Sequence, residues 1–140
     1  MVSEICATDG GREILAEVKF SSSYEEVEAN LVLTNEMKTI IMMETSFPGT
    51  GFSDFAYLVK RIRVEGTFLE AEELLKLRNA LGVVRDLALF FKREESVKYP
   101  RLKALAQPVT LSPVMVDKID AIVTKHGKVK DNASPELQNI

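Results

Sequence analysis

The sequence is short of the residue types from which cross-links and many active sites are built. Its 140 residues contain one cysteine, Cys6, which excludes an intrachain disulfide and fits a reducing cytoplasm. Its one histidine, His126, would need carboxylate or thiolate partners to bind a metal, and only Asp120 stands nearby. We place His126 in the last turn of a helix, where a cation offsets the helix dipole. The sequence therefore predicts no metal site and no histidine-activated nucleophile.

Motifs for nucleotide binding and for membrane insertion are also missing. The Gly49–Gly51 loop lacks the third glycine of a dinucleotide loop and the Gly-Lys-Ser/Thr of a P-loop. No apolar run approaches the roughly 18 residues that a membrane span needs. The N-terminus has no basic region followed by an apolar core, so no signal peptide is predicted. Adjacent carboxylates such as Glu72 and Glu73 fall on faces that look solvated. We predict no catalytic residue, no cofactor and no membrane partner for this segment.

The apolar residues that are present follow a helical pattern. Hydrophobic residues make up 46% of the chain and charged residues 28%, as in a folded domain that can bury a core. Apolar positions recur at three- and four-residue steps, and alternation of period two is rare. We predict one all-α domain over residues 1–140, an elongated bundle of about six helices. A short strand arm at residues 128–130 is the exception.

Capping signals and glycines divide this pattern into helices. The first helix begins before Cys6 and restarts at Gly10-Gly11. Ser23 with Glu26 predicts a capping box, and so does Thr67 with Glu70. The other predicted helices cover residues 24 to about 44, 53 to 66, 70 to 94, 100 to 106 and 113 to 127. For the helix that begins at residue 24, the side chains expected to face inward are Tyr24, Val27, Leu31, Thr34, Met37 or Lys38, and Ile41, with Ile40 widening this stripe. The stripe expected for the long fourth helix comprises Leu74, Leu77, Leu81, Val84, Leu87 or Ala88, and Phe91.

Basic residues gather in the last third of the chain. The net charge is −3, yet between residues 98 and 130 seven lysines and arginines stand against only Asp117 and Asp120. This third is either a solvated lysine-rich face or a surface that contacts phosphate. The candidates for nucleic-acid contact are Lys125, Lys128 and Lys130. Aromatic residues do not interleave them, so a base-stacking platform is not expected.

The last residues predict a helix start without a helix. After an Asp131-Asn132 turn, Ser134 suits an N-cap and Pro135 the first helical position. A helix that stops at Ile140 has no stability of its own. Because the first helix also lacks an N-cap, we expect the chain to be a piece of a longer protein, with any catalytic parts elsewhere.

Four segments resemble type 2 MutS proteins, the bacterial branch without a mismatch-reading domain. Residues 127–137, G-K-V-K-D-N-A-S-P-E-L, are similar to the conserved stretch that closes the N-terminal region of that family. Residues 8–13, 52–70 and 73–78 resemble the preceding blocks in the same order. The resemblance spans nearly the whole chain, and its most specific part is the last stretch.

The resemblance implies that this chain is the N-terminal part of the core, or lever, domain. In that family long helices connect a DNA-embracing clamp to a C-terminal ATPase, followed by a small Smr-type nuclease domain. The whole protein is expected to be a cytoplasmic homodimer that uses ATP and Mg²⁺. It is expected to bind DNA, to suppress homologous recombination and, in some bacteria, to split collided ribosomes. The ATPase and nuclease motifs would lie beyond Ile140, so no residue here inherits them.

Other interpretations remain open. A self-contained helical module could bind a partner helix or dimerise through a face that includes Met37, Met42 and Met43, although core packing is the commoner use of methionine. An enzyme in its own right is a third interpretation. Phe68-Leu69-Glu70 also has the F-x-E spelling with which mismatch-reading MutS proteins wedge DNA. It lies at a helix start, so we expect Phe68 to pack as a staple and Glu70 to cap the helix.

Overall fold

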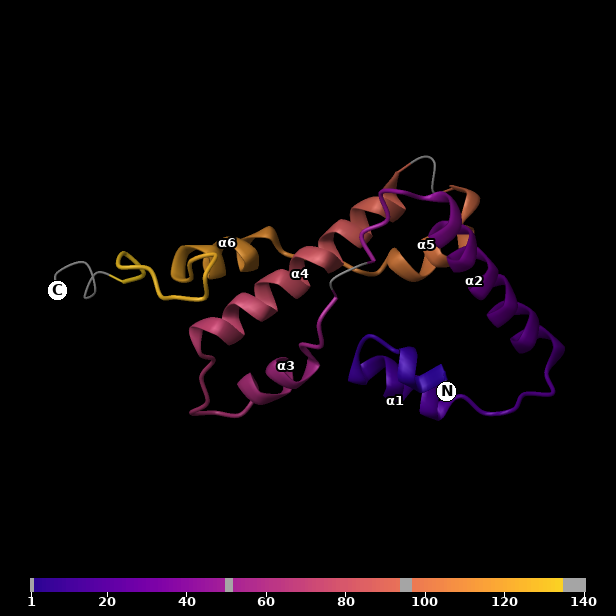
Figure 1. Cartoon of the computed structure of the whole chain (residues 1–140), viewed down its shortest axis with the longest axis horizontal. Coiled ribbons are helices and arrows are strands. Elements are labelled where there is room, and N and C mark those ends of the chain that lie inside the picture. The colour runs from indigo at the N-terminus through magenta and orange to yellow at the C-terminus, as the bar shows by residue number, and fades with distance from the viewer. Residues whose placement is uncertain (1, 50–51, 94–96, 135–140) are drawn as a thin grey trace.

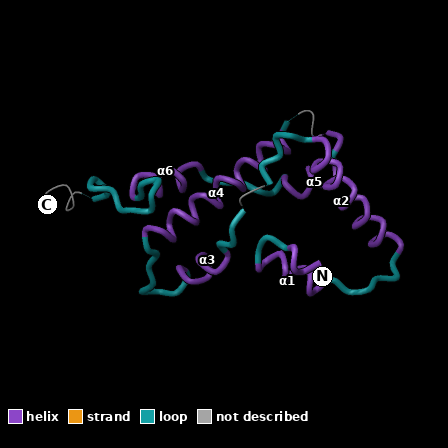
Figure 2. Tube along the Cα trace, viewed as in Figure 1, coloured by secondary structure: helices purple, strands orange, loops and turns teal. Residues whose placement is uncertain are grey.

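The computed structural model describes residues 2–49, 52–93 and 97–134, and this part of the chain is helical (Figures 1 and 2). The predicted all-α class is confirmed. The elements are a short 3-10 helix, η1 (Val2–Ile5), and the α-helices α1 (Asp9–Glu17), α2 (Tyr24–Met43), α3 (Ala56–Ile62), α4 (Ala71–Lys92), α5 (Pro100–Ala106) and α6 (Pro113–Ile122). Among the described helices, none combines the length and apolarity that a membrane crossing requires.

Helix α4 is the axis of the molecule and gives it an elongated shape (Figure 1). Its N-terminal half packs against α3 and α6, and its C-terminal half packs near α2 and α5. The buried apolar residues accordingly form two separate clusters. The α3–α4–α6 cluster contains Leu58, Leu77, Leu81, Val116, Ile119 and Val123. The α2–α4–α5 cluster contains Ile40, Phe90, Phe91 and Tyr99.

The beginning of α4 differs from the predicted cap. The Thr67 hydroxyl lies 2.7 Å from the carbonyl oxygens of both Arg61 and Val64, so it closes the preceding turn and does not cap a helix. Glu70 is the N-cap residue, as expected, and its backbone N–H donates to the Glu73 carboxylate at 3.0 Å. The capping pair is therefore Glu70 with Glu73, three residues after the predicted pair.

The expected staple also involves a different residue. Phe68 is exposed, so its predicted packing against the helix is wrong. Leu69, directly before the N-cap, packs on the α3–α4–α6 cluster together with Leu74 in the second turn. These are the positions at which a hydrophobic staple fixes the entry of the chain into a helix.

Helix α3 is shorter than the sequence predicted. It begins at Ala56, whose N–H donates to Asp54 Oδ1 at 3.1 Å, and it ends at Ile62. Gly66, which we expected to cap this helix, lies in the following turn at φ 81°. The side chain that buries α3 is Leu58, which is fully buried in the α3–α4–α6 cluster.

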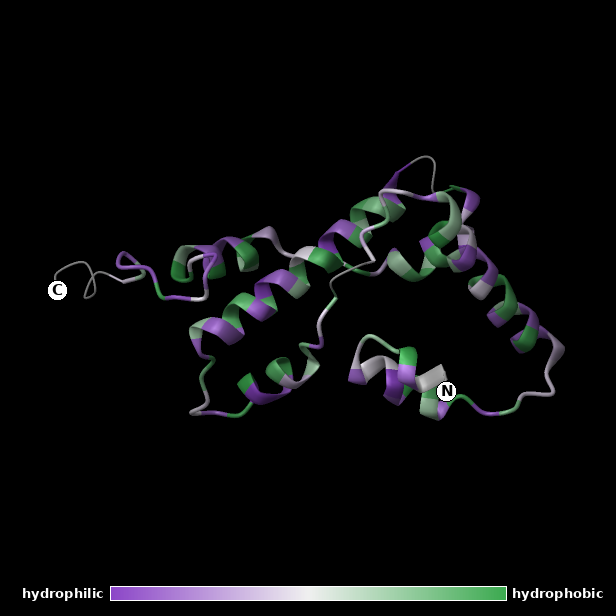
Figure 3. Ribbon diagram, viewed as in Figure 1, coloured by the Kyte–Doolittle hydropathy of each residue, from purple (hydrophilic) through white to green (hydrophobic). Residues whose placement is uncertain are grey.

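Helix α2 turns a different face inward from the one we predicted. Tyr24, Leu31 and Ile41 of the expected stripe are 76%, 64% and 70% exposed. The buried positions are Glu36 and Ile40. Hydrophobic residues recur along α2 (Figure 3), in runs such as 31–33 and 40–43 that turn to several sides of the helix, so periodicity alone could not choose its buried face.

The contact between α2 and α5 explains why a glutamate is buried. Glu36 is only 7% exposed, and its two carboxylate oxygens accept from Arg101 N–H at 3.1 Å and Leu102 N–H at 2.9 Å. These N–H groups belong to the first turn of α5, which has no side-chain cap of its own. A carboxylate from α2 therefore caps α5 and interacts favourably with the positive end of its dipole.

The cap of α2 is half of the predicted capping box. Ser23 Oγ accepts from Glu26 N–H at 3.4 Å, as expected. The Glu26 carboxylate accepts from the Ser21 hydroxyl at 2.5 Å instead of from Ser23 N–H. The Ser23 N–H donates to Ser21 Oγ at 3.2 Å, so the serine run supplies the missing half.

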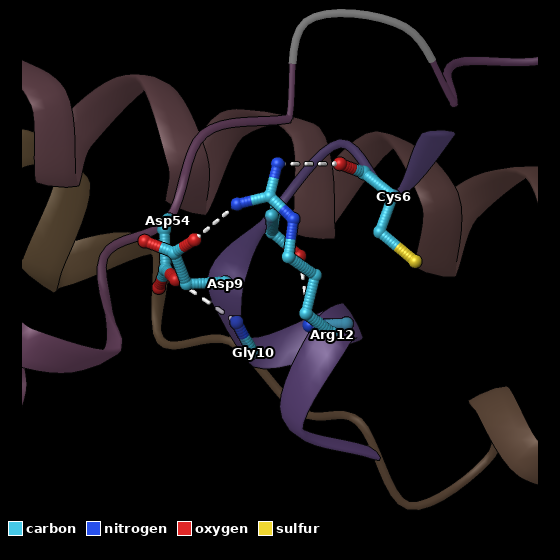
Figure 4. A network of polar contacts seen from close by, with 7 residues as sticks. Cys6, Asp9, Gly10, Arg12 and Asp54 are labelled. Atoms are coloured by element: carbon cyan, nitrogen blue, oxygen red, sulfur yellow. Dashed lines mark hydrogen bonds and ion pairs between the residues drawn. The ribbon is translucent and has the colours of Figure 1, made fainter. Parts of the chain in front are cut away.

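Helix α1 takes part in a network of polar contacts (Figure 4). It restarts at Asp9, as the double glycine predicted, with the Thr8 hydroxyl accepting from Gly11 N–H at 3.0 Å. The N–H of Gly10 donates to Asp54 Oδ2 at 3.1 Å, which ties α1 to the segment before α3. The apolar side chains of Ile14 on this helix and of Val18 at its end are exposed.

A few predicted features lie outside the described residues. These are Glu94, the predicted last residue of the fourth helix, Thr50 and Gly51 of the Gly49–Gly51 loop, and the helix start from Pro135 onward. The Asp131-Asn132 turn is described and confirmed, with Ala133 N–H donating to Lys130 O at 3.0 Å.

Candidate nucleic-acid interface

The chain folds back in a tight hairpin directly after α6. A single antiparallel β-bridge joins Val123 to Val129, so the predicted strand arm is reduced to one bridge. Helix α6 ends at Ile122, and His126 therefore lies in the hairpin loop and not in the last turn of a helix, as we had expected. Backbone hydrogen bonds flank the bridge, from Thr124 N–H to Lys128 O at 2.7 Å and from Lys130 N–H to Ile122 O at 2.8 Å.

The loop of this hairpin depends on Gly127. Its N–H donates to Thr124 O at 3.0 Å, and its φ of 70° lies in the left-handed region that favours glycine. A Cβ atom at this position would lie 3.3 Å from Cγ and 3.5 Å from Cα of Glu72. The loop therefore packs closely on the first turn of α4, so the backbone conformation favours glycine and a side chain here would press on Glu72.

An ion pair holds α6 against α4 beside the hairpin. Arg78 Nε and Nη2 donate to the two carboxylate oxygens of Asp120, at 2.8 and 2.9 Å. The Arg78 hydrogen bond holds the pKa of Asp120 below its ordinary value, and the same bond raises the pKa of Arg78. The Lys130 ammonium donates to the backbone oxygen of Asp120 at 2.6 Å. Asp120 thus connects α4, α6 and the hairpin.

These elements enclose a hollow of roughly 690 Å³. Most of its polar lining comes from α4 and from the hairpin, and its apolar floor comes from both helices. The lining residues are Leu75, Arg78, Asn79, Ile119, Asp120, Val123, Thr124, Lys125, His126 and Lys130.

The three predicted contact residues occupy different positions around this hollow. Lys125 and Lys130 line it, whereas Lys128 is exposed on the hairpin and does not. Lys130 is half-buried and already bound to Asp120, while Lys125 is exposed. The sequence reasoning missed Arg78, which stands beside the inward stripe of α4. Its position next to Leu77 hinted at partial burial, but its partner 42 residues away gave no local signal.

A second, apolar groove lies between α2, α4 and α5. Its volume is roughly 870 Å³. Met37 and Ile41 of α2 line one side, and Val84 and Leu87 of α4 line another. Met42 and Met43, the other members of the predicted methionine group, are exposed beside it.

Ligands for a metal ion do not converge in the described part of the chain. In residues 2–49, 52–93 and 97–134, no three histidine, cysteine, aspartate or glutamate side chains are grouped so that they could hold one. Cys6, the single cysteine of the sequence, is half-buried.

The chain is similar to proteins named endonuclease MutS2. It is 30% identical over 142 residues to that of Alkaliphilus oremlandii, which covers 100% of this chain and 18% of the relative. It is 34% identical over 126 residues to that of Clostridium botulinum, covering 88% of this chain and 16% of the relative. It is 30% identical over 137 residues to the putative endonuclease MutS2 of Bacillus subtilis, covering 96% and 17%.

These comparisons confirm that the chain resembles one segment of type 2 MutS proteins. The chain spans less than a fifth of the length of the curated relatives that it matches. No family model matches the chain, and no solved structure does.

Proposed function

We propose that this chain is a non-catalytic lever segment of a MutS2-type protein, with residues 1–140 forming the N-terminal part of its core domain. The observation that carries the proposal is the position of α4. This one helix of 22 residues contributes buried side chains to both apolar clusters, Leu77 and Leu81 to one and Phe90 and Phe91 to the other.

The lever action follows from the stiffness of a continuous helix. At 1.5 Å per residue, α4 is about 33 Å long. Packed interfaces such as the two clusters do not deform continuously, so a displacement of one is passed to the other as a rigid-body movement. In the whole protein this movement would link a DNA-binding clamp to an ATPase.

The other properties of the whole protein are inferred from its relatives. We propose that the longer chain binds ATP with Mg²⁺ outside this segment, acts on DNA as an endonuclease, and works in recombination control. We also propose that the whole protein is a homodimer in the cytoplasm and that in some bacteria it binds ribosomes. The support is the similarity to segments of proteins named endonuclease MutS2.

Within this segment, the proposed contacts to nucleic acid are Lys125, Lys128 and Lys130. They are supported by their position on a hairpin beside a hollow that Arg78 also lines. Each lysine–phosphate contact releases a condensed counterion, so binding should weaken with salt.

The test replaces the three lysines together by alanine in the 140-residue chain. Binding of a fluorescent DNA duplex at low salt should weaken and depend less steeply on salt, by about 0.9 in the log–log slope for each lysine that binds a phosphate. The control variant replaces Lys38, Lys60 and Lys92, which are exposed on α2, α3 and α4, and therefore changes the net charge equally. Equal binding by the two variants would mean that the hairpin lysines act only through net charge.

The exposed end of α2 favours a second candidate function, a helical interaction module. Ile41, which lines the apolar groove, is exposed, and so are Met42 and Met43, which follow it in the sequence. If this face joins two copies of the chain, sedimentation velocity should show a concentration-dependent dimer that Met42→Glu dissociates. A monomer at all concentrations would speak against self-association.

A further inference from the structure

We propose that the hollow between α4, α6 and the hairpin binds a phosphate group, with Arg78 as its central ligand and Asp120 as the residue that positions it. This inference rests on the proposed nucleic-acid contact of the hairpin lysines and names its chemistry. The shared ligand chemistry is a phosphate, which a nucleic-acid strand or a free phosphate can supply.

Arg78 has donors left for such a ligand. A guanidinium carries five N–H groups, and the bidentate pair with Asp120 uses one on Nε and one on Nη2. Nη1 has no hydrogen-bond partner in the part of the chain that the structure describes. The side chain is 35% exposed and lines the hollow, so a ligand can reach it. A planar guanidinium is well suited to bind phosphate through two parallel hydrogen bonds.

The other charges in the hollow favour an anion. Lys125 and Lys130 line it together with Arg78, and Asp120 is the one carboxylate among its described lining residues, so the local charge is three positive minus one negative, or +2 with His126 neutral. The whole chain, by contrast, carries −3. The Lys130 ammonium uses one of its three donors on the Asp120 backbone oxygen and keeps two for a ligand.

Asp120 organises these ligands even though its own charge repels an anion. Its carboxylate fixes the plane of the Arg78 guanidinium, and its backbone oxygen holds the Lys130 ammonium. Without the carboxylate, the arginine side chain would lose its fixed orientation. A ligand would then have to order it on binding, at a cost in conformational entropy. Asp120 is therefore a positioning residue, whose removal should weaken binding although it makes the chain more positive.

The first experiment compares Arg78→Gln with Arg85→Gln. Both replacements remove one positive charge from α4, but Arg85 is exposed, pairs with its neighbour Asp86, and lies outside the hollow. With a fluorescent DNA duplex, Arg78→Gln should weaken binding about tenfold, the effect of removing one charged hydrogen bond. It should also lower the salt slope by about 0.9, whereas Arg85→Gln should leave the slope unchanged.

Asp120→Asn separates positioning from simple repulsion. If Asp120 positions Arg78, this variant binds the duplex more weakly than the wild type. If it only repels the ligand, the variant binds more tightly, and the role assigned to Asp120 is wrong. Circular dichroism checks that each variant is folded. If a variant does not fold, the wild-type chain is titrated with duplex instead, and a shift of the Arg78 Nε–H NMR signal shows whether the ligand contacts Arg78.

A parallel titration with inorganic phosphate identifies the source of the ligand. Duplex binding that is insensitive to Arg78→Gln overturns this inference but leaves the lysine contact standing. A phosphate-induced shift of the Arg78 Nε–H signal without duplex binding supports the hollow as a small-anion site and refutes the nucleic-acid contact. If neither ligand shifts that signal and the duplex does not bind, both proposals are wrong.

Discussion

At the scale of single residues, this fold is held by side chains that bridge elements far apart in the sequence. Glu36 of α2 caps α5, and Asp120 of α6 joins Arg78 of α4 to the hairpin. Gly127 lets the hairpin approach α4 closely.

Gly127→Ala should destabilise the chain more than Gly66→Ala. Both glycines have positive φ, 70° and 81°, so each alanine should cost about 1–2 kcal/mol in backbone strain. Only at Gly127 would the new Cβ approach another residue, Glu72, at 3.3 Å, whereas no described atom lies within 4 Å at Gly66. Crowding should lower the unfolding free energy by about 1 kcal/mol more. Urea denaturation of both variants measures the unfolding free energy. An equal loss in the two variants would refute close packing of the hairpin on α4.

The pair of Asp120 with Arg78 should make stability depend on pH. Because the arginine hydrogen bond holds the pKa of Asp120 below its ordinary 3.8, the ionised pair stabilises the fold above that value. This contribution is lost as pH falls through the lowered pKa. Asp120→Asn should therefore melt at a lower temperature than the wild type at about pH 7, and the gap should narrow below about pH 3.8. Asp117→Asn, exposed on the same helix, serves as the control, and a gap that is constant with pH would exclude the pair as its cause.

At the scale of elements, α4 shows how far sequence periodicity can predict packing. Leu77, Leu81 and Phe91 of its predicted stripe are buried, whereas Leu89, which lies outside that stripe, is exposed. Periodicity does not predict the packing of α2, because this helix is apolar on several sides and its contact with α5 decides which residues are buried. The candidate site shows the same contrast between features visible in the local sequence and features that depend on packing. The gathering of lysines near the hairpin is visible in the sequence, and their contact with nucleic acid stays a prediction. The Arg78–Asp120 pair has no such local signal, because it forms only where two helices meet.

The packing of α4 leads to a prediction for two leucines on the same helix. Leu81 is 7% exposed and Leu89 is 52% exposed. Leu81→Ala should lower the unfolding free energy by about 3 kcal/mol, because it leaves a cavity in the α3–α4–α6 cluster. Leu89→Ala should cost less than about 1 kcal/mol. Chemical denaturation distinguishes the two, and similar values would mean that the buried face of α4 has been misassigned.

At the scale of the whole molecule, we propose that α4 couples the two apolar clusters into one rigid lever. The clusters share no residue, so α4 is the continuous packed element that reaches both. Arg85 is exposed in the stretch of α4 between Leu81 and Phe90, where a break would separate the clusters without entering either. Proline there removes a helical hydrogen bond and costs about 3 kcal/mol or more.

The most direct test measures the distance between spin labels on the two ends. Labels at Ala104→Cys on α5 and Ala121→Cys on α6, both exposed positions, are introduced in a Cys6→Ser background. Double electron–electron resonance should give one narrow distance distribution, which Arg85→Ala preserves and Arg85→Pro broadens. A broad distribution in the unbroken chain, or one that Arg85→Pro leaves narrow and unshifted, would contradict the lever.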